Sequence, residues 1–182
     1  MFEHDAQKMV ALFEKHVAAE LNGDLDTTMA TMTDHPHLIN LPTGHGGVGR
    51  DEVHAFYRDF LVGKFFPPDV EMTSVSRTVN AERIVDEMII SFTHTQEIPW
   101  MLPGVAPTGK AVVAAFVVIV GVKEGKVDYE HIYWDQASVL VQIGKLDPKG
   151  LPVAGIETGK KLLDESLPSN TLMAAWKDSE GK

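Results

Sequence analysis

Residues 110–141 read KAVVAAFVVIVGVKEGKVDYEHIYWDQASVLV, and their pattern is the most informative one for the fold class. Its apolar run, Ala111–Val122, is rich in Val and Ile and is shorter than the roughly 20 residues that a membrane span needs. We therefore predict two strands, Lys110–Val122 and Val127–Val141, joined by a hairpin turn at Lys123–Lys126. The first strand should be buried on both faces, because it is apolar at even and odd positions.

The chain upstream of this hairpin changes from a helical to a strand period. Helices are expected at Asp5–Asn22, near Asp26–Met32 and at Asp51–Val62, where apolar residues recur every three or four positions. Asp69–Val79 and Ile84–Ile98 are strand candidates with short links, which favour antiparallel pairing. Helices first and strands later is the order of an α+β domain, not of βαβ alternation.

The remaining segments are shorter. His37–Leu41 is expected to be a short strand, and Gly44–Gly49 a flexible glycine-rich loop. We predict a single domain over residues 1–145. Residues 146–182 then form a C-terminal extension, in which Glu157–Leu167 is a possible short helix.

Composition limits the function classes. The chain has 182 residues, 44% of them hydrophobic, which is typical of one globular domain. The formal net charge of −10 argues against nucleic acid and against anionic membrane surfaces as partners. The sequence contains no cysteine, which excludes disulfides and thiol catalysis and fits a cytoplasmic location.

Three motifs resemble ligand sites without their structural context. Gly44–Gly49 matches the dinucleotide fingerprint G-x-G-x-x-G, but consecutive antiparallel strands follow it instead of a βαβ unit. Gly104–Ala111 nearly matches a phosphate loop, but a strand follows where a helix is needed. The eight histidines include no H-E-x-x-H pattern. We therefore expect neither a cofactor nor a metal ion.

Chemistry-bearing side chains concentrate at 129–136. If this segment is an unbroken strand, Tyr129, His131, Tyr133 and Asp135 share one face, while Glu130, Ile132 and Trp134 share the other. The first face is either solvated or lines a cavity that has aromatic walls and one acid.

A second polar group continues the core-facing side of Ile84–Ile98. Its even positions are apolar from Met88 to Phe92, and His94 follows on the same side. His94 is then either a hydrogen-bonded core histidine or the polar end of a pocket. The apolar loop 99–103, which contains Trp100, is suited to close over a ligand.

The order of these motifs resembles the SnoaL-like polyketide cyclase branch of the nuclear-transport-factor-2-like superfamily. The resemblance covers residues 5–145 and depends on Gly49–Tyr57, Pro107–Lys110, and Glu130 and Trp134 ahead of Asp135. It also includes Gln142-Ile143-Gly144, which in the cyclases follows the aspartate after a short helical stretch. The family fold is cone-like, with a strongly curved antiparallel sheet wrapped around N-terminal helices and a deep pocket open at one end.

The resemblance implies cofactor-free acid–base chemistry on a small apolar substrate, as in a cyclase, isomerase, dehydratase or hydrolase. Asp135 is expected to be the acid/base and His94 its catalytic partner on the same cavity; alternatively, Asp135 only accepts a backbone amide near Ser138. The expected substrate-binding residues are His37, Tyr57, Phe92, Trp100, His131, Tyr133 and Trp134.

The alternative function is a non-catalytic ligand-binding or association module of the same fold. A cavity of a few hundred cubic ångströms beside Asp135 would favour chemistry, whereas an occluded pocket would favour association. We also expect a homodimer, because one apolar face of Ala111–Val122 remains after the other fills the core. The C-terminal extension is the alternative cover for that face.

Overall fold

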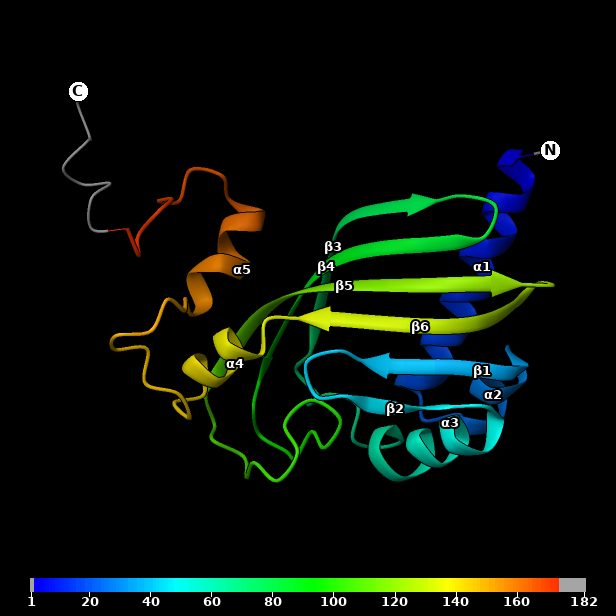
Figure 1. The fold of residues 1–182 in the computed structure, drawn as a ribbon, viewed down its shortest axis with the longest axis horizontal. Coiled ribbons are helices and arrows are strands. Elements are labelled where there is room, and N and C mark those ends of the chain that lie inside the picture. Colours follow the sequence, from blue (N-terminus) through cyan, green and yellow to red (C-terminus); the bar gives the residue numbers. More distant parts are fainter. Residues whose placement is uncertain (1, 174–182) are drawn as a thin grey trace.

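One curved, open sheet of six strands dominates the computed structural model, which describes residues 2–173 (Figure 1). The strand order is β2-β1-β6-β5-β4-β3. The bounds are β1 (Met32–Asn40), β2 (His45–Val48), β3 (Glu71–Val79), β4 (Arg83–Thr93), β5 (Ala111–Lys123) and β6 (Lys126–Trp134). The predicted α+β class is confirmed.

The helices lie before the first strand, between β2 and β3, and after the last strand. They are α1 (Phe2–Leu21), α2 (Leu25–Ala30), α3 (Arg50–Phe56), a π-helical turn η1 (Tyr57–Leu61), α4 (Gln136–Gln142) and α5 (Ile156–Leu163). In Figure 1, α1 crosses behind the sheet, and α2 and α3 lie beside the β1 and β2 edge. The long helix covers the inner face of the sheet, where the core lies.

The strands β3 to β6 form the predicted antiparallel meander. The sequence did not indicate that β1 pairs in parallel with β6, where Leu38 lies opposite Glu130 and Asn40 opposite Ile132. This pairing joins the N-terminal part of the chain to the last strand. It also places Asn40, the last residue of β1, beside Ile132 of β6 on the inner face of the sheet.

Two sequence expectations about local structure are wrong. The last strand ends at Trp134 rather than Val141, because Asp135 accepts a hydrogen bond from the Ser138 amide (3.0 Å) and starts α4. The expected loop at Gly44–Gly49 contains the strand β2, which pairs with β1. A Cβ atom at Gly46 would overlap the Leu38 carbonyl oxygen, so glycine allows this close approach.

The outer face of β5 is only partly covered. The inward side chains Val112, Phe116 and Val120 are buried, whereas the outward Val117 and Ile119 are half-buried. The expectation of a strand buried on both faces therefore holds for the inner face alone. At one end of β5, α5 packs so closely that a Cβ atom at Gly159 would lie 2.9 Å from the Val113 carbonyl oxygen.

None of the helices within residues 2–173 combines the length and the apolar character that crossing a membrane requires.

Candidate functional site

A cavity of about 360 Å³ lies between α1 and the inner face of the sheet. Its walls are largely apolar and include the rings of Phe13, Phe56, Phe66, Trp100 and Phe116. The space suits a small ligand, since ligand pockets are usually apolar with a few placed polar groups. The polar lining therefore decides what chemistry the cavity supports.

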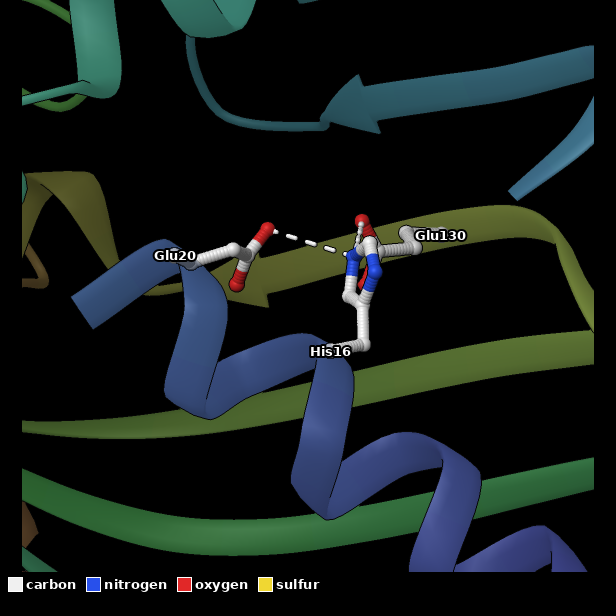
Figure 2. Close-up of side chains that lie close together, drawn as sticks. All are labelled: His16, Glu20 and Glu130. Atoms are coloured by element: carbon white, nitrogen blue, oxygen red, sulfur yellow. Dashed lines mark ion pairs between the residues drawn. The ribbon is translucent and has the colours of Figure 1, made fainter. Parts of the chain in front are cut away.

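Two of the lining carboxyl groups, Glu20 on α1 and Glu130 on β6, belong to a buried polar cluster. Figure 2 shows both carboxyl groups near the ring of His16, which lies one helical turn before Glu20. The His16 Nε2 atom is 3.4 Å from a carboxyl oxygen of each glutamate. The hydroxyl of Tyr57 donates to Glu130 Oε2 at 2.7 Å. His16 and Tyr57 are fully buried behind the two carboxyl groups.

The hydrogen bonds of Thr31 assign the protons of His16. The Thr31 hydroxyl donates its single proton to the Thr28 carbonyl (2.6 Å), so it can only accept from His16 Nδ1, also at 2.6 Å. Nδ1 is therefore protonated. On the other side of the ring, Nε2 faces acceptors, namely the two carboxyl groups and the Tyr57 oxygen at 3.3 Å. These contacts are those of an imidazolium that donates from both nitrogens.

The electrostatics of the cluster agree with this assignment. Burial alone lowers the pKa of His16, but Glu130 and then Glu20 outweigh burial and raise it well above 6.5. Burial also raises the pKa of Glu130, but His16 and the Tyr57 hydroxyl lower it to below its usual range. The pKa of Glu20 is raised by burial and by the charge of Glu130. The two carboxyl groups therefore differ: Glu130 is held ionised, and Glu20 is the one that takes up a proton more easily.

A second polar pair lines the mouth of the cavity. Arg77 on β3 donates from Nε (3.1 Å) and Nη2 (2.7 Å) to the two carboxylate oxygens of the buried Asp86 on β4. The guanidinium also lies 5.3 Å from the ring centroid of Phe13. Glu14, Met72 and Arg77 are solvent-exposed lining residues, so the cavity opens between α1 and β3.

The same cluster has donor atoms of the kind that bind metal ions. His16, Glu20 and Glu130 each offer one nitrogen or oxygen, and these atoms lie within 4.8 Å of one another. A proton on His16 Nε2 and a metal ion would compete for the same lone pair. The hydrogen bonds described above are those of the protonated form. The expectation of no metal stays a prediction.

The structure does not bring Asp135 and His94 together on this cavity, and neither residue lines it. Asp135 is exposed and caps α4 through the Ser138 amide, as in the structural alternative for this residue. His94 is fully buried beyond the end of β4, where its Nδ1 lies 3.2 Å from the Thr108 hydroxyl. The physical reason is that Asp135 follows the odd-numbered side of β6, which points to the outer face of the sheet, whereas the cavity lies on the side of Glu130 and Ile132.

The expected substrate-binding residues divide into three groups. Trp100 lines the cavity, and Tyr57 contacts it through Glu130. Phe92 and Trp134 are buried one layer behind the lining, where Phe92 packs on Phe66 and Trp134 on Phe116. The third group lies on the outer face of the sheet, away from the cavity: His37, His131 and Tyr133, with the His37 and His131 rings 5.4 Å apart.

Comparison with known proteins assigns a family to this arrangement. The model of the SnoaL-like domain matches residues 4–130. The chain belongs to the SnoaL-like family. The resemblance inferred from the sequence motifs is therefore confirmed. No curated protein matches the chain.

Solved structures share the SnoaL-like fold at low sequence identity. A protein assigned as a SnoaL-like polyketide cyclase from Jannaschia sp. CCS1 has 18% identity and a TM-score of 0.61 over 78% of this chain and 95% of that one. AclR from Streptomyces galilaeus, assigned as a hydroxylase, has 22% identity and a TM-score of 0.58 over 78% and 88%. IdmH from Streptomyces antibioticus, assigned as a polyketide cyclase, has 17% identity and a TM-score of 0.57 over 75% of this chain and 98% of that one. At these identities the likeness establishes the fold.

The polar cluster of this SnoaL-like chain was not found from the sequence. A signal for it exists in α1: His16 and Glu20 continue the spacing of Met9 and Phe13 on the buried side of the helix. Polar residues at core positions need partners, so this pattern indicates a buried polar site. On β6 the candidate face was the wrong one, because Glu130 points inward and the neighbouring tyrosines and histidine do not.

Proposed function

We propose that this SnoaL-like protein is a cofactor-free acid–base enzyme that moves a proton on a small apolar substrate bound in the cavity. The observation that carries the proposal is the pair Glu20 and Glu130, which share one imidazolium and have pKa values shifted in opposite directions. Environments that separate two neighbouring carboxyl groups in this way are typical of acid–base sites.

Glu20 is the proposed proton-transfer group. In its ionised form it accepts a proton from a substrate carbon beside a carbonyl group and returns it to another substrate atom, as isomerases, cyclases and dehydratases require. The cluster formally carries one net negative charge before this step, from two carboxylates and one imidazolium, and none after it. Glu130 and Tyr57 are positioning residues, because they hold His16 beside Glu20 without donating their own protons to the substrate.

The cavity also helps to distinguish an enzyme from a non-catalytic binding module. A volume of about 360 Å³ remains open beside a pair of carboxyl groups, although these are Glu20 and Glu130 rather than Asp135. A site devoted only to binding an apolar ligand has no need of a buried ionised cluster, which is costly to desolvate. This observation favours acid–base chemistry.

The test uses 2-tetralone, a small bicyclic ketone with exchangeable hydrogens beside its carbonyl. The wild-type protein should accelerate exchange of these hydrogens in D₂O, followed by NMR. Glu20→Gln should lose about 10²–10⁴-fold of the acceleration, since Gln cannot accept the proton. The matched control is Glu14→Gln, which changes an exposed glutamate on the same helix at the cavity mouth and should retain the rate.

Equal exchange rates in the wild type and Glu20→Gln would contradict the proposed role of Glu20. Binding of 2-tetralone without any acceleration would favour the non-catalytic alternative.

The half-buried outer face of β5 supports a further part of the proposal, that the protein is a homodimer. A cytoplasmic location is part of the proposal too, and the cysteine-free sequence supports it.

A further inference from the structure

Asn40 is a buried polar residue on the cavity wall that the proposed proton transfer does not use. It is the last residue of β1 and is 1% exposed. Its neighbour in the sheet is Ile132 of β6, two positions after Glu130 and on the same inner face. Asn40 and Glu130 therefore lie on the sheet side of the cavity, opposite α1.

The hydrogen bonding of Asn40 is incomplete. Its Nδ2 donates to the His45 carbonyl at 3.2 Å, and this bond fixes which way the amide points. The other atom, Oδ1, is buried and has no hydrogen-bond partner among residues 2–173. Buried acceptors without a partner are rare in folded proteins, and each one costs stability. A group from outside the chain that donates a hydrogen bond would satisfy it.

The other polar groups of the cavity indicate what kind of ligand supplies that donor. The inner wall is lined by Glu20, Glu130 and Asn40, whose side-chain oxygens can accept hydrogen bonds, and of these the buried Asn40 Oδ1 lacks a partner among the described residues. Among the described lining residues, two have side-chain donors that no buried partner occupies: Ser74 and the part of the Arg77 guanidinium that does not bind Asp86. Both lie at the exposed mouth of the cavity. A ligand that fits this order has apolar rings and presents a hydroxyl group to the inner wall.

We propose that Asn40 is a specificity residue that accepts a hydrogen bond from a hydroxyl group of the bound ligand, so that the cavity selects hydroxylated aromatic compounds. The inference rests on the proposed function only in taking this cavity as the ligand site. It requires no proton transfer by Glu20, and a purely binding protein would show the same preference.

The experiment compares 2-naphthol with 2-methoxynaphthalene, which keeps the ring system and the oxygen but lacks the donor. Calorimetric titration of the wild-type protein should show at least about tenfold tighter binding of 2-naphthol, as expected when a buried acceptor is left unpaired by the ether. In Asn40→Leu this preference should fall to about twofold or less. Comparing the ratio of the two ligands across variants cancels the extra size of the methoxy group.

Two control variants define the outcome. Ser74→Ala removes another polar group of the cavity lining, at the exposed mouth, and should keep the preference for 2-naphthol. Asp135→Asn, at an exposed cap outside the cavity, should also keep it, and the titration measures binding alone, so its outcome does not depend on the proton-transfer proposal. Circular dichroism checks the fold of each variant, and Asn40→Ala replaces Asn40→Leu if the latter does not fold.

A wild-type protein that binds both ligands equally would overturn the inference, because a trapped water would then satisfy Asn40 in both complexes. An undiminished preference in Asn40→Leu would overturn it as well, since the hydroxyl would then be donating to another acceptor. Loss of the preference in Asn40→Leu together with its retention in Ser74→Ala would support it.

Discussion

The hydroxyl of Thr31 fixes one proton of the buried cluster, because it leaves His16 Nδ1 only the role of donor. With Nδ1 protonated, the two carboxyl groups and the Tyr57 oxygen hold a second proton on Nε2. The cation then keeps Glu130 ionised and leaves Glu20 with a raised pKa. Thr31, which lies outside the cavity, thus orients the imidazole ring that separates the pKa values of the two carboxyl groups.

The raised pKa of His16 predicts how stability depends on pH. The folded state holds this proton up to the raised pKa, whereas the unfolded chain releases it near 6.5, so the folded state binds more protons between the two values. The stabilisation is fully present below about pH 6.5 and is lost as the pH rises through the folded pKa, by at most about 1.4 kcal/mol per pH unit. Denaturant unfolding of the wild type at a series of pH values measures this slope.

The control for this prediction is His16→Gln, which should flatten the decline above pH 6.5. The pKa values of His94 and His131 are lowered, that of His94 by burial and then by Lys145. These two residues therefore change the free energy of unfolding only below about pH 6.5, where they make it rise with pH. A wild-type stability that rises between pH 6.5 and 8.5 would contradict a charged His16.

Asp135 gives the second prediction at this scale. As the N-cap of α4 it should tolerate Asn, which caps equally well, whereas Asp135→Ala should lower the free energy of unfolding by about 1 kcal/mol. Activity per folded molecule should be unchanged in both variants, because Asp135 is exposed and does not line the cavity. Chemical denaturation together with the 2-tetralone exchange assay checks both statements. A stable but inactive Asp135→Asn would restore Asp135 as the acid/base.

Among the elements, the contact between α5 and β5 depends on a helical glycine. Ala at an exposed helical position normally adds roughly 1 kcal/mol relative to Gly. At Gly159 the added methyl group would lie 2.9 Å from the Val113 carbonyl oxygen and 3.1 Å from Val113 Cγ1, so α5 must move away from the strand. Helix α5 is therefore packed on the sheet, not merely attached to it.

We predict that Gly159→Ala loosens α5 despite the better helix propensity. Hydrogen exchange of residues 156–163 should become faster, and thermal unfolding should not shift upward. The matched control, Lys160→Ala, changes an exposed neighbour and should leave exchange nearly unchanged. Slower exchange in Gly159→Ala would show that the close contact with Val113 is absent in solution.

For the whole molecule, the uncovered part of the outer sheet face predicts self-association. Light scattering should give twice the chain mass of 20.0 kDa. Val117→Lys should produce monomers, because it places a charge in the middle of this face. Its neighbour across the strand pair is Glu87, which compensates the new charge in the monomer and preserves the fold.

Light scattering that shows a wild-type monomer at micromolar concentration would contradict the dimer. Thermal unfolding of Val117→Lys provides the control, since an unfolded variant would not report on association.

Hydrophobic period, turn residues and short links were enough to predict the α+β class, the antiparallel meander and the approximate helix positions, because these signals act between neighbours in the chain. The SnoaL-like family was predicted from a resemblance in the order and spacing of motifs. Boundaries shifted where a local hydrogen bond competed, as at Asp135, where a capping carboxylate ended β6 early.

The location of the site depends on contacts between parts of the chain that are distant in sequence. Alternation along β6 defines two faces, but which of them points inward depends on the side that α1 covers, and this placed Glu130 inside and His131 outside. Likewise, His16 and Glu20 become a proton-transfer candidate only when folding brings Glu130 and Tyr57 to them, since their pKa shifts arise from burial and from charges distant in sequence.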